Sequence, residues 1–373
     1  MEKSERPTGH MLISAEGGKV HIVDVGKTSK GAFMTMGDSW LTTQVYDFIS
    51  GTGSQVALDP FAGQGDMLRV LEEKLGLSVM GLDIDESIGR WETNDSLKSL
   101  TDWEVVANSQ SRNNKVNPIV VTNPPFLSNY SAKRKSLMSE VGHYFDSEKG
   151  LTDLYMVALT RCLESFENVV AIVPETFVSS SYPKNRCRAI TILEDNPFED
   201  TTFPICVTCW SKSTEGNPTV YIGEEEAGRL DHLWGYRINP ENDTAIKFNQ
   251  PNGRIGLRAV DGHDPSSRIG FMPAEKLGYD RASIKDSSRL MTYIEISAVL
   301  EGDIPRLTSL ANEILEGVRR NSHDVVLSGF KGNNKEGKRR RRLDYELARG
   351  ILERALSESN SYQSGRNTVP LGS

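Results

Sequence analysis

Between residues 56 and 210, short apolar runs alternate with stretches of helical periodicity, and this alternation constrains the fold most strongly. Residues 56–58 predict a strand, and residues 67–75 predict a helix with leucines along one face. Alternating strands and helices predict an α/β fold: a Rossmann-like, largely parallel sheet with helices on both faces. Ligands of such sheets bind at the carboxyl ends of the strands, so the residues that follow each strand are the candidates for a functional site.

Further strands and helices follow from the same patterns. Strands are expected at residues 78–82, 104–107, 119–121, 169–173, 189–193 and 205–210, and helices at residues 154–166, 307–319 and 344–356. After Ser213, glycine, proline, asparagine and charged residues become frequent. This change predicts one domain over residues 1–215 and a C-terminal α+β region over residues 216–373. The polar residues 357–373 are expected to be disordered.

Composition is that of an ordinary globular protein, and a cytoplasmic location is expected because nothing in the sequence suggests export. The chain has no run of 18 apolar residues and a polar N-terminus, so neither a membrane span nor a secretory signal is expected. The four cysteines are expected to be reduced thiols: Cys162, Cys187, Cys206 and Cys209. Cys206 and Cys209 form a CxxC pair without a second pair at ligand spacing, so we expect no metal site and interpret them as small apolar residues in a strand.

A basic cluster stands out in a chain whose net charge is −8. The negative total argues mildly against a nucleic-acid partner, but local charge matters more than the sum. So many like charges close together repel each other unless an anion binds them. We therefore expect phosphate contacts from Lys338, Arg339, Arg340, Arg341 and Arg342, with Lys331 and Lys335 nearby. The alternative is a solvated run on a flexible loop, because glycines and asparagines flank it.

The loop after the first strand has the sequence DPFAGQGD over residues 59–66. A turn of small residues lets a ligand approach the backbone, and the following helix offers free N–H groups. The second strand ends at Asp83, whose carboxylate can accept both ribose hydroxyls of a nucleoside. A dinucleotide fingerprint would need glycine where Leu68 stands, so a nucleoside without a pyrophosphate, such as S-adenosylmethionine, fits better. A tight turn in an ordinary α/β domain is the alternative.

The tetrapeptide NPPF at residues 123–126 is more specific. Its prolines end the strand and make a rigid loop at the carboxyl edge of the sheet. The Asn123 side-chain oxygen and the Pro124 carbonyl can accept the two N–H groups of an exocyclic amine, which polarises its nitrogen towards nucleophilic attack. Phe126 offers an aromatic face to a base. A purely structural proline turn is the alternative.

These two loops resemble the cofactor loop and the catalytic tetrapeptide of the amino-methyltransferases of DNA, specifically the N6-adenine group. Residues 31–35 (GAFMT) resemble the segment that closes over the methionine moiety of the cofactor. Residues 153–155 (DLY) resemble the start of the next helix, and residues 170–177 resemble the fifth strand with its VPxxF ending. The cofactor segments precede the recognition region, which is the gamma arrangement, and the resemblance covers residues 30–210.

The resemblance implies roles for individual residues. It places Thr35, Asp59, Phe61, Gly63 and Gly65 around the methionine side of S-adenosylmethionine, Asp83 at its ribose, and Asn108 where the family often has an acid that accepts from the cofactor's adenine amine. It makes Asn123, Pro124, Pro125 and Phe126 catalytic. Phe203 is expected to stack on the flipped base together with Phe126, and Phe198 competes for that role.

The implied activity is site-specific methylation of adenine N6 in double-stranded DNA, on a base rotated out of the stack. Such an enzyme would belong to a restriction–modification system or act as an orphan or phage modification enzyme, and a cognate restriction endonuclease is a further candidate partner. Three alternatives stay open: an RNA guanine-N2 methyltransferase with an NPPF loop, a protein glutamine-N5 methyltransferase, and a protein that binds nucleic acid without turnover. The long, basic-tipped C-terminal region favours DNA, and the intact tetrapeptide favours catalysis.

Overall fold

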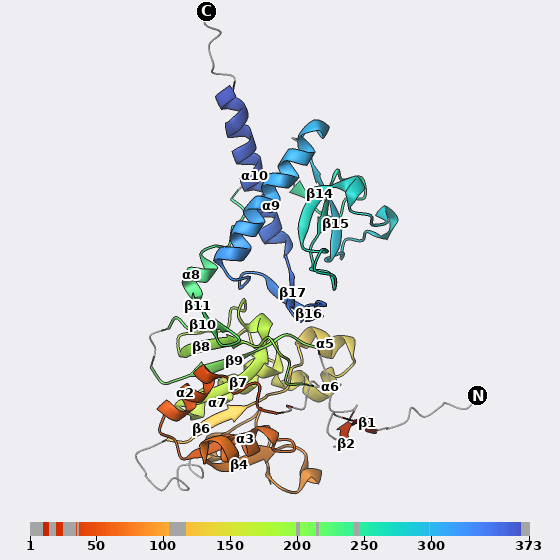
Figure 1. Cartoon of the computed structure of the whole chain (residues 1–373). Helices are drawn as coiled ribbons and strands as arrows, with labels where there is room; N and C mark the ends of the chain where they lie inside the picture. Colours follow the sequence, from red (N-terminus) through yellow and green to blue (C-terminus); the bar gives the residue numbers. More distant parts are fainter. Residues whose placement is uncertain are drawn as a thin grey trace, which may run out of the picture. The chain divides into compact units, whose positions relative to one another are not determined.

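The computed structural model describes residues 10–14, 20–24, 35, 37–103, 117–198, 202–213, 216–241, 246–297 and 299–366. The chain divides into two compact units, residues 1–226 and residues 227–373 (Figure 1). The first unit extends past residue 215, because β10 (Thr219–Ile222) pairs in parallel with β8 (Cys187–Ile192) and so belongs to the same sheet. No described helix is long and apolar enough to cross a membrane.

A nine-stranded sheet forms the framework of the first unit. Its strand order is β11 (Glu225–Arg229), β10, β8, β9 (Ile205–Trp210), β7 (Asn168–Pro174), β6 (Ile119–Thr122), β3 (Val56–Asp59), β4 (Ser78–Asp83) and β5 (Glu92–Thr93). From β5 to β7 the neighbouring strands are parallel, whereas β9 runs antiparallel to both β7 and β8. The carboxyl ends of the parallel strands therefore lie along one edge of the sheet.

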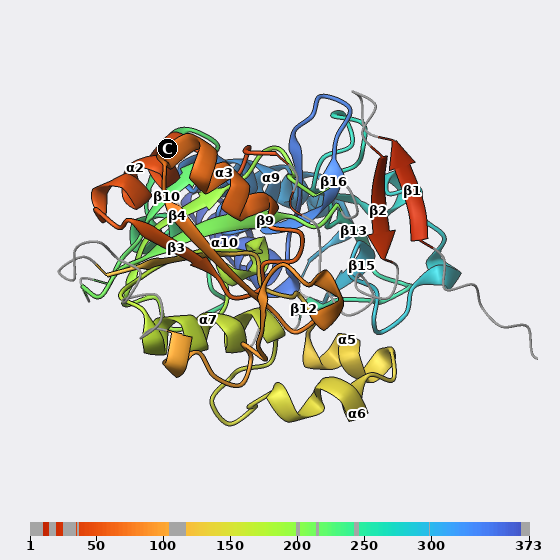
Figure 2. The same cartoon turned by 90° about the horizontal axis from the view of Figure 1, so that it is seen from below.

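Helices cover both faces of this sheet. Figure 2 shows α2 (Thr43–Gly51) and α3 (Asp66–Leu75) on one face and α7 (Leu154–Ser165) on the other. The first face is filled by a core that includes Trp40, Leu68 and Leu71, all fully buried. The predicted α/β class with a largely parallel sheet is confirmed.

Most predicted strands lie within two residues of their observed bounds. The expected strand at residues 104–107 lies outside the described residues. On the side of β4 away from β3, the described partner strand is instead the two-residue β5. Leu82 pairs with Glu92, and Asp83 pairs with Thr93. The place of β5 in the sheet matters for the site, because the residues that follow it reach the same edge as Asp83.

The remaining elements of the first unit are short. They are the hairpin β1 (His10–Ser14) and β2 (Val20–Asp24), helices α5 (Asn129–Arg134) and α6 (Met138–Val141), and the 3-10 turns Glu86–Ile88, Gly142–Tyr144 and Glu175–Phe177. Ser128 caps α5 by accepting a hydrogen bond from the Ser131 amide at 3.1 Å. Helix α5 thus begins three residues after the last residue of the NPPF tetrapeptide.

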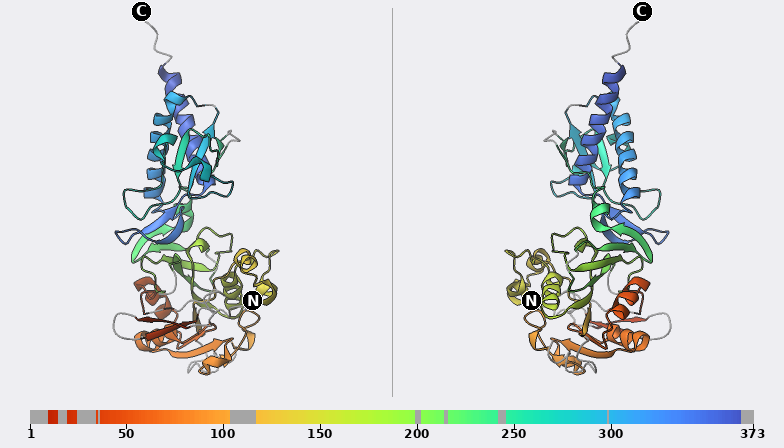
Figure 3. Two further views of the ribbon diagram at one scale, coloured as in Figure 1. Left: turned by 90° about the vertical axis from the view of Figure 1, so that its right-hand side faces the viewer. Right: turned by 90° about the vertical axis from the view of Figure 1, so that its left-hand side faces the viewer.

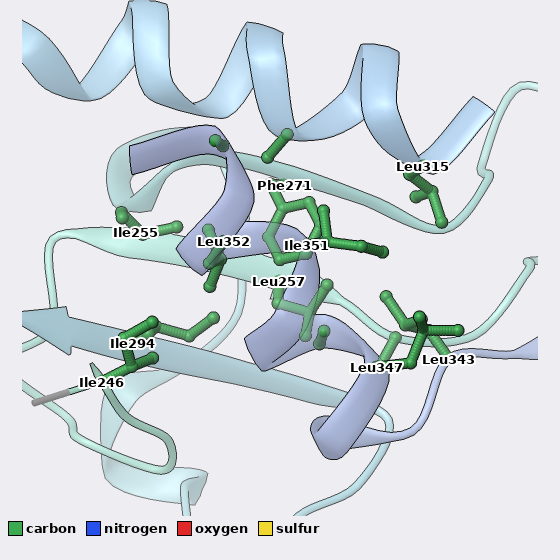
Figure 4. Close-up of a cluster of buried hydrophobic side chains, with 14 of the residues drawn as sticks. Ile246, Ile255, Leu257, Phe271, Ile294, Leu315, Leu343, Leu347, Ile351 and Leu352 are labelled. Carbon is green, nitrogen blue, oxygen red and sulfur yellow. The ribbon is translucent and has the colours of Figure 1, made fainter. Parts of the chain in front are cut away.

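The second unit has a four-stranded antiparallel sheet in the order β12 (Ile246–Lys247), β15 (Met291–Ile296), β13 (Ile255–Arg258) and β14 (Gly270–Pro273). Its helices are α8 (Leu230–Trp234), α9 (Ile304–Asn321) and α10 (Tyr345–Arg366), and 3-10 turns lie at Ala274–Lys276, Arg281–Ser283 and Glu301–Asp303. Helices α9 and α10, in light and dark blue, run alongside each other (Figure 3). Figure 4 shows their leucines and isoleucines packed against side chains of the sheet.

The C-terminal helix corrects one expectation. Helix α10 continues to Arg366, so the prediction of disorder is wrong for residues 357–366. The sequence there keeps helix-stabilising features, including an ion pair at i,i+4 spacing in which Arg354 Nε donates to Glu358 at 3.0 Å.

Candidate functional site

The glycine-rich loop (residues 59–66) follows β3, and its backbone amides donate hydrogen bonds to the end of β4. Strand β3 ends at Asp59, and Gly63 and Gly65 adopt positive φ angles of 51° and 82° before α3 begins at Asp66. The Gly63 amide donates to Asp83 Oδ2 at 2.8 Å, and the Asp85 amide donates to Asp83 Oδ1 at 2.9 Å. The predicted cofactor loop and the predicted ribose-binding acid are therefore in direct contact.

Asp59 is a buried carboxylate beside the tetrapeptide. Its Oδ1 accepts from the Thr122 hydroxyl at 2.6 Å and from the Phe61 amide at 3.0 Å, and no donor among the described residues reaches Oδ2. Burial raises the pKa of the Asp59 carboxyl to about 7, although both hydrogen bonds act in the opposite direction. Because Thr122 immediately precedes Asn123, this contact fixes the spacing between the first loop and the tetrapeptide.

Thr35 joins the site from 88 residues away. Asn123 Nδ2 donates to Thr35 Oγ1 at 3.1 Å, and Thr35 forms an isolated antiparallel bridge with Phe198. Thr35 is buried, whereas its predicted neighbours at residues 31–34 lie outside the described residues. The structure thus brings together a residue predicted for the cofactor and a residue predicted for catalysis.

Aromatic side chains surround Phe126. Its ring meets Phe198 edge-on with centroids 6.0 Å apart, and meets Tyr155 edge-on with centroids 6.4 Å apart. Phe198 is buried, whereas Phe203 is 38% exposed. The structure therefore places Phe198 against the tetrapeptide, and base stacking by Phe203 stays a prediction.

Asp95 is a candidate site residue that no signal in the sequence indicated. It lies two residues after β5, and the neighbouring Asn94 amide donates to the Asp83 carbonyl at 3.0 Å. Asp95 Oδ2 accepts from the Tyr144 hydroxyl and Lys98 Nζ, each at 2.8 Å, whereas Oδ1 is buried without a hydrogen-bond partner in the described structure. Asn108, expected to follow the third strand, lies outside the described residues. A two-residue strand is too short for periodicity to reveal.

In the second unit, the basic cluster forms a β-hairpin. Strand β16 (Ser328–Asn333) pairs with β17 (Arg339–Arg342), so the alternative of a run on a flexible loop is wrong for residues 339–342. Lys331, Lys335 and Lys338 are exposed, and the arginines of β17 are half-buried except Arg341, which is only 4% exposed. Burial leaves the Arg341 guanidinium unable to reach a phosphate in this structure, which corrects that part of the predicted contact surface.

Asp261 binds strand β17 of this hairpin through both its carboxylate and its backbone carbonyl. Its carboxylate accepts from Arg319 at 3.1 and 3.2 Å and from the Arg341 amide at 3.1 Å. Its carbonyl accepts from Arg340 Nε at 2.7 Å, and Arg319 also binds Asp324 at 2.8 Å. Arg319 and Asp261 are mostly buried, with side chains 8% and 13% exposed. The network holds the basic strand in one position.

The cysteines show no arrangement for a metal. Cys206 and Cys209 lie in β9, and their spacing of three points their side chains to opposite faces of the sheet. All four cysteines are buried free thiols, and burial raises the pKa of each one. In the described part of the chain, no group of three or more histidine, cysteine or acidic residues could hold a metal ion.

Comparisons with known proteins gave structural matches only. No protein-family model matches the chain, and no match was found among curated proteins. The methyltransferase subunit of a type I restriction-modification system from Streptococcus thermophilus matches with a TM-score of 0.37 at 15% identity, over 54% of this chain and 49% of that one. A DrdV–DNA complex matches with a TM-score of 0.35 at 13% identity, over 53% of this chain and 28% of that one.

A third match is the M protein of the type I restriction enzyme EcoKI, with a TM-score of 0.28 at 12% identity, over 73% of this chain and 68% of that one. The chain thus spans about half or less of the length of the first two proteins. Likenesses this distant carry no argument about activity, and the function must be argued from the site itself.

Proposed function

We propose that the chain is a site-specific DNA adenine N6-methyltransferase that uses S-adenosylmethionine. One observation carries the proposal: the hydrogen bond of 3.1 Å between Asn123 and Thr35, next to the bond of 2.6 Å between Thr122 and Asp59. These contacts join three segments, each of which resembles a different part of one family's site. A structural proline turn would not require such convergence.

The residues present fit the cofactor. Asp95 Oδ1 is a buried acceptor without a partner in the described structure, as the amine of an adenine ring requires. Asp59 Oδ2 lacks a recorded donor and suits the cationic methionine end. Asp83, next to the Gly63 amide, would hold the ribose hydroxyls. When bound, the cofactor supplies the methyl group.

The protein's own part is positioning and polarisation. The Asn123 side-chain oxygen and the Pro124 carbonyl would accept the two hydrogens of the adenine amine, so that its lone pair points at the methyl donor. Pro125 keeps the loop rigid, and Phe126, braced by Phe198 and Tyr155, offers the surface on which the flipped base stacks. No covalent intermediate with the protein is needed.

Affinity for S-adenosylmethionine is expected to rise as pH rises through about 7. The free Asp59 carboxyl has a pKa raised to about 7 by burial and is protonated below that pH, whereas the cationic cofactor binds best to the carboxylate. Below the pKa, affinity should fall by about tenfold per pH unit, because binding must displace the proton. Calorimetry from pH 5.5 to 8.5 measures this, and Asp59→Asn should flatten the profile. A flat profile in the unchanged protein would contradict the role.

Asp95→Ala is expected to weaken cofactor binding by about tenfold or more, because a hydrogen bond to a charged acceptor is lost. The variant should also lose discrimination between S-adenosylhomocysteine and its hypoxanthine analogue, which lacks the amine. Exposed Glu92 in β5 provides the control Glu92→Ala, which should change neither quantity. Unaltered discrimination in Asp95→Ala would move the adenine contact elsewhere.

We further propose that the exposed lysines of the β16–β17 hairpin contact DNA phosphates. Alanine at Lys331, Lys335 and Lys338 should weaken binding to every duplex alike, and should lower the slope of log affinity against log salt by up to about 0.9 per lost contact. Alanine at the exposed Lys247, Lys276 and Lys285 of the same unit is the control. An unchanged salt slope in the hairpin variant would identify the cluster as a solvated face.

The function itself is tested in cells. DNA from a host that expresses the chain should carry N6-methyladenine at one short sequence motif when sequenced by a methylation-sensitive single-molecule method. The same host with the Asn123→Ala variant should lack it. Unmodified DNA despite abundant folded protein would count against the proposal.

A further inference from the structure

Trp91 lies at the edge of the predicted cofactor site. It immediately precedes β5, whose parallel register with β4 sets Trp91 at the level of Gly81, two residues before Asp83. The side chain is half-buried and packs against the core under α3, and the guanidinium carbon of the exposed Arg90 lies 4.4 Å from the centroid of its ring. No role was expected for this tryptophan from the sequence.

The indole holds the glycine-rich loop by its polar edge. Trp91 Nε1 donates to the Gly63 carbonyl at 2.9 Å, while the Gly63 amide donates to Asp83 Oδ2 at 2.8 Å. Gly63 is therefore fixed at both of its backbone polar groups, in the left-handed conformation that favours glycine. Trp91, just before β5, holds the carbonyl, and Asp83, at the end of the neighbouring strand β4, holds the amide.

The indole also fills the space beside two glycines. A Cβ at Gly65 would come within 2.5 Å of Trp91 Cζ2. A Cβ at Gly81 would overlap the opposite side of the same six-membered ring and would also lie 2.8 Å from Ala62 Cβ in the loop. A Cβ at Gly63, in contrast, would meet nothing within 4 Å. Gly65 was expected to be small so that the cofactor can approach. In the structure its side-chain space, like that of Gly81, accommodates Trp91.

We infer that Trp91 is a positioning residue that sets the glycine-rich loop in the shape that binds the cofactor. The inference rests on the proposed function and adds to it a residue that does not touch the reacting atoms. We call the contact of Trp91 with Gly63 and Gly65 the clamp. A loop that is already fixed loses less conformational freedom when ligand binds, so removing the clamp should raise the cofactor's Kd and KM. It should leave kcat at saturating cofactor unchanged, because the catalytic tetrapeptide is elsewhere.

The test compares two variants that disturb the clamp from opposite sides. Trp91→Phe keeps an aromatic ring but removes the N–H donor. The new methyl group in Gly81→Ala displaces the unchanged indole and also presses on Ala62 of the loop. Trp210→Phe is the matched control, because that buried indole also donates a hydrogen bond, to Thr208 at 2.8 Å in β9. Calorimetry with S-adenosylmethionine, steady-state kinetics and thermal melting are measured on the full chain.

Both clamp variants should raise the Kd and KM for the cofactor, Trp91→Phe by about threefold to tenfold, with kcat unchanged. Trp210→Phe should alter melting only. In the unchanged protein, the Trp91 indole N–H should exchange slowly with solvent and more slowly with cofactor bound, a measurement that needs no variant.

Normal cofactor binding by the unchanged protein, together with unaltered Kd and KM in folded Trp91→Phe and Gly81→Ala, would overturn the inference alone. A rapidly exchanging indole N–H would do the same. Absence of cofactor binding by the unchanged protein would overturn the proposed function, and this inference with it.

Discussion

Replacing Asn123 with alanine is expected to lower kcat by about 100-fold or more, because one of the two acceptors that polarise the amine is lost. Cofactor affinity should survive, since in the proposed site the side chain faces the amine to be methylated. Because Asn123 contacts Thr35, a residue predicted for the cofactor, calorimetry with S-adenosylmethionine must accompany the kinetics.

Asn117 offers a matched control for this substitution. It lies at the other end of the same strand, two residues before β6 begins, and so is remote from the carboxyl edge. Asn117→Ala should leave kcat unchanged. Near-normal turnover by Asn123→Ala would remove the tetrapeptide from the catalytic account.

Replacing Arg319 with methionine is expected to destabilise the second unit by about 3–5 kcal/mol, because Asp261 and Asp324 would then be left with uncompensated charge in a mostly buried place. Methionine keeps the apolar part of the Arg319 side chain, so the lost stability comes mainly from the ion pairs. Because Asp261 also holds the backbone of the basic strand, the hairpin should loosen as well. Denaturant unfolding and amide exchange of α9 and β17 measure both effects.

Arg354→Met in α10 serves as the control for this prediction. Its partner is Glu358, and the two side chains are 58% and 44% exposed, so the substitution should cost no more than about 0.5 kcal/mol. Equal, small losses in the two variants would show that the Asp261 network contributes little.

The strands and the first loop could be predicted because their signals are local. Residues 56–59 are all buried. The apolar run at residues 56–58, followed by an acid and small residues, predicts a buried strand that ends at the ligand-binding edge of the sheet. The position of the NPPF loop could be predicted equally well, since two prolines determine where the strand ends. Their contact through Thr122 and Asp59 follows from pairing neighbouring parallel strands.

The parts that could not be predicted depend on contacts between distant residues. Asp95 follows a strand of two residues, which is too short to show periodicity. Its proposed role depends on the burial of its Oδ1 atom, which only the structure reveals. Arg341 looked like its neighbours in the basic run, but alternation along β17 turns it inward. The spaces beside Gly65 and Gly81 are explained by Trp91, which is 26 residues from one and 10 from the other.

The central claim is tested most directly by transfer of a radiolabelled methyl group from S-adenosylmethionine to duplex DNA, RNA and protein in parallel reactions. The account predicts that label enters duplex DNA alone, that digestion recovers it as N6-methyladenine, and that Asn123→Ala abolishes it. Label in RNA guanine or in protein glutamine would contradict the assigned substrate. Cofactor and DNA binding without any transfer would show a protein that binds nucleic acid without turnover.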